Sequence, residues 1–415
     1  MSFFRIYIYL KFPIFLKSLF TNYSSDIKLV ENTFKKTTKK NHSIILSQLR
    51  VGFILILKYL KKKNPKKNEI IISSYNLAEM VNICRNFNLK TIYPKLNENI
   101  FLHDEDLKKK INNRTLAVVV TNIFNNSHEL IKIKNICRKK KVILIEDNAI
   151  YYGNYFLNKG KKIFSGSFGD YSLHSFNIMK NISAMYGGLV STNNNDFIKY
   201  VKKEIANFSN FSFLKYAHQI IVYLVLKLFS FNLFYRFIFF YLIKLAHKNN
   251  NNFILQAIYP SLKFKKENNY RKYLKKVHPF TVKLLKFQIK DKKNFIKNFK
   301  IRKDNNIYYS KLFNKYKINN VKTINLKQPT FQNFNDFPII IKNKKKLQDF
   351  LFKKGIETKK IQYIDCHKIF SNKKNAKFLQ NYEDKVLCLP NHIKISKKYI
   401  EYIVSNIKFF YLNKN

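Results

Sequence analysis

The sequence predicts an α/β fold built on a mainly parallel sheet, and two observations carry this prediction. Short runs rich in β-branched residues alternate with helical patterns between residues 69 and 145, an order typical of parallel strands joined by crossover helices. The chain has 415 residues and is 46% hydrophobic, which allows a substantial buried core and excludes a disordered protein.

The individual elements follow from the same patterns. Strands are predicted at 69–73, 90–93, 116–121 and 142–145, and helices at 43–60, 77–88, 104–111, 130–139 and 282–312. Residues 337–410 alternate strand-like and helical segments, as in a small α+β domain. We therefore expect four parts: an N-terminal apolar and basic segment (1–40), a large α/β domain (41–205), an apolar helical insert (206–280), and a connecting helix with the small C-terminal domain (281–415).

The net charge of +55 would by itself favour a nucleic-acid or anionic-membrane partner. The lysines are spread over nearly the whole chain, however. The abundant residues (Lys, Asn, Ile, Phe, Tyr) have AT-rich codons, and the scarce ones (eight Gly, eight Pro, no Trp) have GC-rich codons. A biased genome therefore explains the charge, and we predict no nucleic-acid partner. The four cysteines form no CxxC pair, which favours reduced thiols in a cytoplasmic protein and suggests no metal site.

Residues 219–245 form a second apolar segment, interrupted by Lys227, Arg236 and Lys244. Its length would suit a bilayer span. If it is one helix, Lys227 and Arg236 point to opposite sides of it. Three interpretations stay open: a transmembrane helix, monotopic contact with a membrane surface, or a helical pair packed on its own protein or on a subunit partner. We retain peripheral membrane contact through 219–245 as the prediction.

The segment 143–188 is the most informative part of the chain. It holds six of the eight glycines, where even spacing would put about one. Asp147 is expected just past a strand end, where open α/β sheets bind ligands. Lys180 lies in the middle of the glycine-rich region. A lysine that forms a Schiff base needs a packed, partly desolvated position, and a strand-end carboxylate can keep a pyridinium nitrogen protonated. Ser175 could donate to a phosphate.

These residues fall in register with a known motif. Ile145-Glu146-Asp147-Asn148-Ala149, Gly166-Ser167-Phe168-Gly169-Asp170, Ser175-Phe176, Lys180 and Gly187-Gly188 resemble the motif of the DegT/DnrJ/EryC1/StrS family of pyridoxal-phosphate aminotransferases. The likeness extends over about 41–205 and 280–410, and the apolar insert lies outside it. The resemblance implies a fold-type-I transferase and pyridoxal 5'-phosphate as cofactor.

The resemblance also implies residue roles. Lys180 would attach the cofactor as a Schiff base and move the proton at the amino-donor carbon. Asp147 would pair with the pyridine nitrogen, Ala149 would pack against the ring, and Ser175 would bind the phosphate. Glutamate would give its amino group, and a nucleotide-linked keto-sugar would receive it for surface polysaccharide synthesis. The family's sugar dehydratases carry histidine in place of the lysine, so Lys180 argues against that reaction. Such enzymes are homodimers.

The phosphate-binding turn departs from the family pattern. It corresponds to about 48–53, around Gly52, and lacks the family's glycine and threonine. This departure keeps an alternative open: a catalytically impaired relative that acts as a binding or membrane-attached protein.

Overall fold

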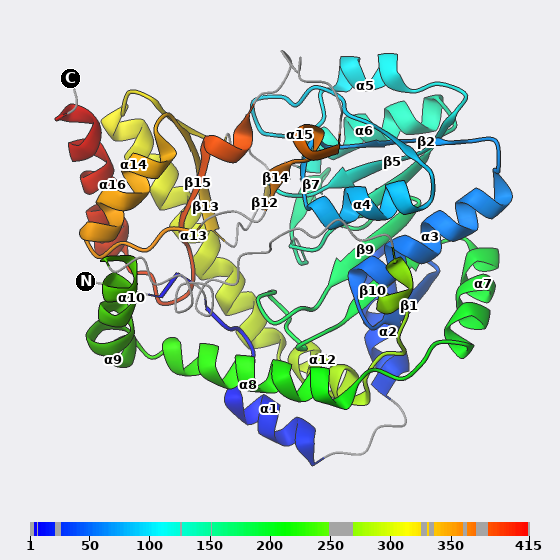
Figure 1. Cartoon of the computed structure of the whole chain (residues 1–415), viewed down its shortest axis with the longest axis horizontal. Helices are drawn as coiled ribbons and strands as arrows, with labels where there is room; N and C mark the ends of the chain where they lie inside the picture. Colours follow the sequence, from blue (N-terminus) through cyan, green and yellow to red (C-terminus); the bar gives the residue numbers. More distant parts are fainter. Residues whose placement is uncertain are drawn as a thin grey trace.

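The computed structural model describes residues 4–5, 7–20, 26–124, 127–150, 152–248, 269–324, 330–331, 336–359, 363–370 and 381–413. Its centre is a seven-stranded sheet (Figure 1). In spatial order the strands are β1 (His42–Leu46), β10 (Gly188–Thr192), β9 (Tyr171–Ser175), β6 (Ile143–Asp147), β5 (Thr115–Thr121), β2 (Glu69–Ile72) and β4 (Lys90–Ile92). Every pair is parallel except the two that involve β10, which confirms the mainly parallel sheet.

Both faces of this sheet are buried, which explains the continuous apolar runs of its central strands. Ala117 and Val119 of β5 belong to one core cluster, and Val118 and Val120 belong to the other. The first cluster includes α3 (Leu49–Lys63), α4 (Ala78–Asn86) and α7 (Asn195–Ala206). The second includes α5 (Asp104–Lys110), α6 (Ser127–Lys139) and the C-terminal part of the chain.

The C-terminal part follows two helices, α12 (Pro279–Lys290) and α13 (Lys292–Tyr316). Its three-stranded sheet joins β11 (Val321–Thr323), β13 (Asp336–Ile341) and β15 (Val386–Pro390), and its helices are α14 (Lys344–Lys353), α15 (Cys366–Phe370) and α16 (Lys397–Leu412). Two small sheets connect it to the large part. β12 (Thr330–Phe331) pairs with the hairpin of β7 (Tyr155–Asn158) and β8 (Lys161–Phe164), and β14 (Ile364–Asp365) pairs with β3 (Tyr75–Asn76).

The predicted helix at 43–60 is wrong in its first third. Residues 42–46 form β1, which pairs along its length with β10, and the helix α3 begins only at Leu49. The strand, the turn and the apolar helix follow each other so closely that their sequence looks like one continuous apolar helix. The isoleucines of the strand favour the extended conformation, and the sheet partner that fixes it lies more than 140 residues away.

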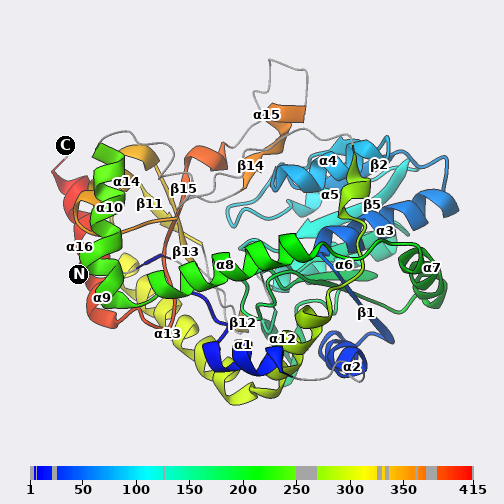
Figure 2. The ribbon, with the colours of Figure 1, turned by 60° about the horizontal axis from the view of Figure 1, so that its bottom comes forward.

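The apolar segment 219–245 is not one helix. α8 (Phe213–Phe229) ends at Ser230, and it is followed by α9 (Asn232–Phe234), a π-helical turn (Tyr235–Phe239) and α10 (Phe240–Lys248). Two N-terminal helices, α1 (Phe12–Leu19) and α2 (Asp26–Thr38), complete this side; α8 crosses the front of the molecule and α1 lies beside it (Figure 2). Within the described residues, none of the helices has the length and apolarity that crossing a bilayer requires.

Gly188 lets the β1–α3 turn approach the start of β10. A Cβ atom placed on Gly188 would lie 2.2 Å from both the carbonyl carbon of Gln48 and the backbone nitrogen of Leu49. Gln48 also forms an isolated bridge with Gly187. The turn into α3 is therefore held directly against the edge of the sheet.

We expect Gly188→Ala to lower the free energy of unfolding by about 3 kcal/mol, because the backbone atoms that it would meet cannot move aside without shifting α3. Gly160→Ala is the matched control: its Cβ would meet nothing within 4 Å, so only its φ of +75° opposes it, at about 1 kcal/mol. Urea unfolding of both variants measures the difference, and equal losses would contradict the close-approach argument.

Candidate active site

The predicted site residues come from the carboxyl end of the central sheet. Asp147 ends β6 and Ser175 ends β9, and these two strands are parallel neighbours. Ser175 pairs with Gly188, which in turn pairs with Leu46 at the end of β1. Asp147, Ser175 and the turn into α3 therefore lie along one edge, at the position where ligands of such sheets bind.

Asp147 is buried, with 2% of its surface exposed. Its Oδ1 accepts a hydrogen bond from the backbone N–H of Ala149 at 2.9 Å, and this bond orients the carboxylate. Burial raises the pKa of Asp147 to about 6, against the opposing effects of that N–H and of the Lys180 ammonium. The carboxylate is therefore costly to hold ionised unless a cation lies next to it.

Lys180 lies on the loop between β9 and β10 and is half-buried. Burial lowers the pKa of its amine to about 8; the positive charge of Lys359 adds to this, and Asp147 opposes it. A lysine with such a pKa has a sizeable neutral fraction near neutrality, which is what nucleophilic attack on a carbonyl requires.

Two later helices brace the loop that carries Lys180. From α12, the side chain of Gln288 accepts from the backbone N–H of Ser183 at 3.0 Å and donates to the Ser183 carbonyl oxygen at 2.6 Å. From α13, the buried Arg302 donates to the side-chain oxygen of Asn181. The sequence gave neither residue this role, because the partners are more than 100 positions apart.

The C-terminal part adds two residues that the sequence analysis missed. Lys359 forms an ion pair with Asp336 at 2.7 Å, and its charge acts on Lys180. Tyr363 is half-buried, and desolvation together with the charge of Asp147 raises the pKa of its hydroxyl. Nothing in the local sequence distinguishes either residue from the many other lysines and tyrosines of this chain.

The segment that was matched to the family's phosphate-binding turn, about 48–53, forms the start of α3. Gly52 lies inside this helix, where it packs against Val190 and Leu173, so it is a packing residue. At the beginning of the helix the N-cap Gln48 makes no side-chain capping bond, and the buried hydroxyl of Ser47 has no hydrogen-bond partner among the described residues. An uncapped helix N-terminus beside an unsatisfied hydroxyl suits a phosphate.

The glycines of the 166–169 loop wrap around Glu146, not around a cofactor. The fully buried Glu146 carboxylate accepts from the backbone N–H groups of Gly166 (2.7 Å), Phe168 (3.0 Å) and Gly169 (3.1 Å). Because neighbours on a strand point to opposite faces, Glu146 fixes the loop while Asp147 stays free for the site.

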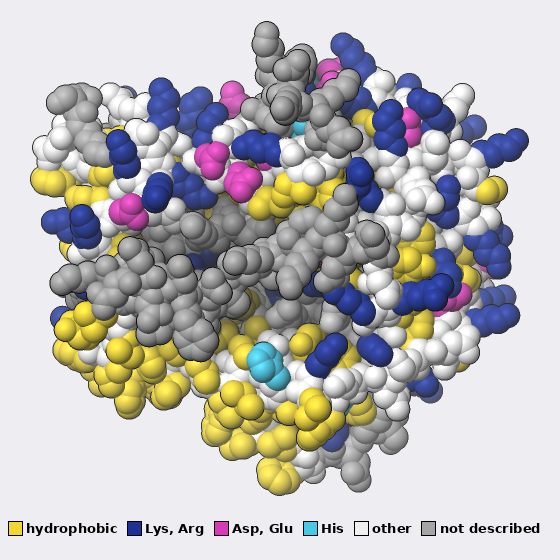
Figure 3. All heavy atoms as spheres, in the orientation of Figure 1, with side chains coloured by type: hydrophobic (Ala, Val, Ile, Leu, Met, Phe, Trp, Pro, Cys, Tyr) yellow, Lys and Arg dark blue, Asp and Glu magenta, His cyan; other side chains and the backbone are white. Residues whose placement is uncertain are grey.

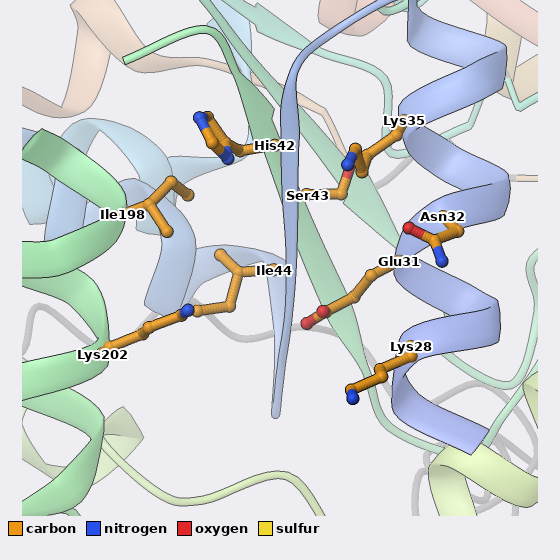
Figure 4. A pocket seen from close by; sticks show the side chains of 9 residues that line it. All are labelled: Lys28, Glu31, Asn32, Lys35, His42, Ser43, Ile44, Ile198 and Lys202. Atoms are coloured by element: carbon orange, nitrogen blue, oxygen red, sulfur yellow. The ribbon is translucent and has the colours of Figure 1, made fainter. Parts of the chain in front are cut away.

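The pocket in Figure 4 lies elsewhere, at the β1 edge of the sheet between α2 and α7. Lys28, Lys35 and Lys202 surround Glu31 there, and Glu31 accepts from the edge-strand N–H of Ile45 at 3.0 Å. None of the four predicted site residues lines it, and Glu31 has a structural function as a partner for the open strand edge.

Comparisons with known proteins agree with the predicted class. A model of the DegT/DnrJ/EryC1/StrS aminotransferase family matches residues 14–230. A GDP-perosamine synthase of Vibrio cholerae is 27% identical over 194 residues, covering 46% of this chain and 51% of that protein. A UDP-4-amino-4,6-dideoxy-N-acetyl-beta-L-altrosamine transaminase of Helicobacter pylori is 22% identical over 161 residues, covering 39% and 42%. The chain thus matches about half the length of these curated relatives.

Solved structures confirm the fold-type-I transferase architecture. The aminotransferase PseC of Helicobacter pylori, described as involved in the biosynthesis of pseudoaminic acid, superposes with a TM-score of 0.74 over the whole of both chains at 15% identity. Spr1654 of Streptococcus pneumoniae, which is described as a putative sugar aminotransferase, superposes in its PLP-form with a TM-score of 0.69 at 13% identity, over 100% of this chain and 99% of that one.

We expect Glu146→Gln to lower the free energy of unfolding by about 2–3 kcal/mol, because an amide NH₂ would face backbone N–H donors in a buried cage. Glu204→Gln is the control, since its ion pair with Lys58 is partly exposed and should be worth under about 1 kcal/mol. Urea unfolding at neutral pH measures both, and a neutral Glu146→Gln would contradict the cage.

The lowered pKa of Lys180 predicts a pH-dependent stability. Above about pH 10.5 the amine is neutral in both the folded and the unfolded state. Below about pH 8 it is charged in both, and its burial then destabilises the cofactor-free protein. Lys180→Met should therefore stabilise at pH 7 by about 1 kcal/mol, a value reduced by partial exposure and by the loss of Asp147's countercharge.

The gain should shrink between pH 8 and pH 10.5. Urea unfolding at three pH values measures it, with the exposed Lys199→Met as a control that should show no such trend. A gain that is constant with pH would show that packing, not charge, is responsible.

Proposed function

Because the matching model covers just over half of its residues, this chain belongs to the DegT/DnrJ/EryC1/StrS aminotransferase family, and we propose that it transfers an amino group to a keto-sugar. Membership confirms the resemblance found in the sequence and the expected cofactor, pyridoxal phosphate. One observation carries the proposed activity. The half-buried Lys180, whose pKa is lowered, and the buried strand-end carboxylate of Asp147 each change the other's pKa through their charges, at the carboxyl edge of the sheet.

The residues at this edge fit pyridoxal phosphate. The unsatisfied Ser47 hydroxyl and the uncapped N-terminus of α3 suit its phosphate, with Ser175 opposite Gly188 as a further donor. Asp147, whose raised pKa reflects a buried carboxylate in need of a cation, suits a protonated ring nitrogen. The side chain of Ala149 is small enough to let the flat cofactor ring pack against it. We assign these roles to Lys180, Asp147, Ala149 and Ser175.

When bound, pyridoxal phosphate supplies an electron sink for charge that develops at the amino-donor carbon. Lys180 then has two tasks: its neutral amine holds the cofactor, and once released it moves the proton at that carbon. Asp147 keeps the ring nitrogen protonated by remaining ionised. The Gln288 and Arg302 braces keep the Lys180 loop in one position while the proton moves.

We further propose glutamate as the amino donor and a nucleotide-linked keto-sugar as the acceptor, in a pathway of surface polysaccharide synthesis. The names of the relatives support this class, since they include a GDP-perosamine synthase and a UDP-linked aminosugar transaminase. A GDP-4-keto-6-deoxy-D-mannose 3-dehydratase of Escherichia coli is also 26% identical over 175 residues, covering 41% of this chain and 44% of that protein. Lys180 favours amino transfer over dehydration.

The rival proposal is a non-catalytic relative with a binding function. The departure of residues 48–53 from the family pattern favours it, whereas the uncapped start of α3 and the unsatisfied Ser47 hydroxyl support phosphate binding by other atoms. We also propose that the protein is a cytoplasmic homodimer with peripheral membrane contact through 219–245.

Purified protein mixed with pyridoxal phosphate should show the absorption band of a covalently held cofactor, and added glutamate should shift it to the aminated form. Lys180→Ala should lose the band and lower turnover by at least about 1000-fold, since both tasks of the amine are lost. Lys199→Ala, an exposed lysine, should change neither. No band at saturating cofactor would reject the enzyme in favour of the rival proposal, and a band unmoved by glutamate would reject that donor.

A further inference from the structure

The outward side of α1, α8 and residues 231–245 is apolar, and we propose that it docks on an anionic lipid bilayer. We call it the apolar face, and it consists of the exposed hydrophobic side chains of these segments. In Figure 3 hydrophobic side chains gather along the lower edge of the molecule, where Figure 1 places α1, α8, α9 and α10. The inference is independent of the proposed enzymatic activity.

α8 carries apolar residues both on its buried inner side and on its exposed outer side. Its inner side is anchored: the buried Tyr216 hydroxyl lies 3.0 Å from the Thr281 hydroxyl, and the buried Tyr223 donates to the Leu10 carbonyl oxygen at 3.4 Å. Its outer side carries Leu214, Ile221, Leu224, Val225 and Leu228, all exposed, and each lies three, four or seven positions from another member. This spacing places them on one stripe of the helix.

The segment after α8 repeats the arrangement. Its outer residues Phe237, Ile238, Tyr241, Leu242 and Leu245 are exposed at helical spacing. Its inner side is fixed to the C-terminal part, where the buried Tyr235 donates to the Glu357 carboxylate at 2.6 Å. The outward stripe is therefore held rigidly and has no other described element to cover it.

The N-terminal helix α1 extends the same face. Phe15 is buried against Tyr223 of α8, with ring centroids 5.0 Å apart, while Phe12, Leu16 and Leu19 point outward. Phe20, at the end of the helix, is 85% exposed. A monomer in water rarely leaves three neighbouring helices with such stripes, so this face is expected to meet an apolar partner.

The charged residues of the segments that form the apolar face have a single sign. No Asp or Glu occurs in residues 1–25 or 205–266, where even spacing of the 24 acidic residues would put about five. Lys17, Lys215, Arg236 and Lys244 are exposed on these helices. Helices that expose apolar side chains and carry cations but no carboxylates fit the boundary between the acyl chains and the anionic headgroups of a bilayer.

Lys227 does not interrupt the face, although it interrupts the sequence. Its ammonium turns inward and donates to the carbonyl oxygens of Ile8 (3.2 Å) and Leu10 (2.9 Å). Burial, with the charge of Lys394, lowers its pKa to about 8. Lys227 therefore adds no charge to the outer side of α8.

The same charges argue against a second copy of this chain as the partner. Two copies joined through this face would bring Lys17, Lys215, Arg236 and Lys244 together with their equivalents, with no carboxylate from these segments to neutralise them. An anionic membrane supplies the missing negative charge as well as the apolar phase.

Flotation of the full-length protein with vesicles tests the proposal. We expect binding to vesicles with about 30 mol% phosphatidylglycerol in phosphatidylcholine, at least tenfold weaker binding to pure phosphatidylcholine, and loss of binding in about 0.5 M salt. Phe213→Ser with Phe237→Ser, at positions 76% and 67% exposed, should weaken binding at least tenfold. Ile369→Ser with Leu412→Ser, exposed on α15 and α16, is the matched control and should have no effect.

A second pair of variants isolates the charge. Changing Lys17, Lys215, Arg236 and Lys244 to Gln should weaken binding at least tenfold. The same change at Lys62, Lys63, Lys109 and Lys140, exposed on α3, α5 and after α6, should weaken it less than threefold although the net charge falls equally. Equal losses in the two sets would overturn the proposal, because the overall charge of the protein would then explain binding.

Three further results would overturn it: no flotation with anionic vesicles, equal binding to neutral vesicles, or a concentration-dependent oligomer abolished by the Phe213→Ser and Phe237→Ser pair. The last would identify a second copy as the partner of the apolar face. Vesicle binding is measured without cofactor or substrate, and the cofactor band and turnover are measured separately. Failure of vesicle binding and failure of the proposed enzymatic activity are therefore distinguishable.

Discussion

The buried carboxylate of Glu146 organises the centre of this protein. It gathers three backbone N–H groups of the 166–169 loop and so ties the end of β6 to the chain entering β9. Asp147 and Ser175 end these two strands, and the parallel pairing of β6 with β9 sets their register. The side-chain amide of Asn122, after β5, joins the same carboxylate at 3.2 Å, so three adjacent strand ends share one anchor. A polar cage of this kind specifies one arrangement of the strand ends, since any other leaves a charge unsatisfied.

The sequence predicted most of the large sheet and the local motif of the site, because both depend on residue patterns within short segments of the chain. Alternation of β-branched runs with helical patterns sufficed for β2, β4, β5 and β6. The register around Lys180 sufficed to pick out the residues that meet at the carboxyl edge. The roles of the glycines became clear only from the structure: Gly166 and Gly169 donate to Glu146, and Gly188 admits the turn into α3.

What the sequence could not predict depends on contacts between distant segments. β1 can be told apart from the following helix α3 only by its pairing with β10. The hydrogen bonds from Gln288 and Arg302 to the Lys180 loop join positions more than 100 residues apart. The unsatisfied Ser47 hydroxyl is visible only once its surroundings are known. The break of 219–245 at Ser230 was hidden for another reason: the residues around it are as apolar as those of the helices that it separates.

The two ends of the apolar insert lie side by side. Ser209 and Lys275 form a parallel bridge, and the backbone N–H of Lys276 donates to the Ser209 carbonyl oxygen at 2.9 Å. The chain thus enters and leaves this segment at almost the same point, so a change in its length would impose little strain on that connection. The segment is held to the rest of the protein mainly by packing, since Tyr216 and Tyr223 belong to a core cluster, and any engineered change of its length would have to preserve that packing.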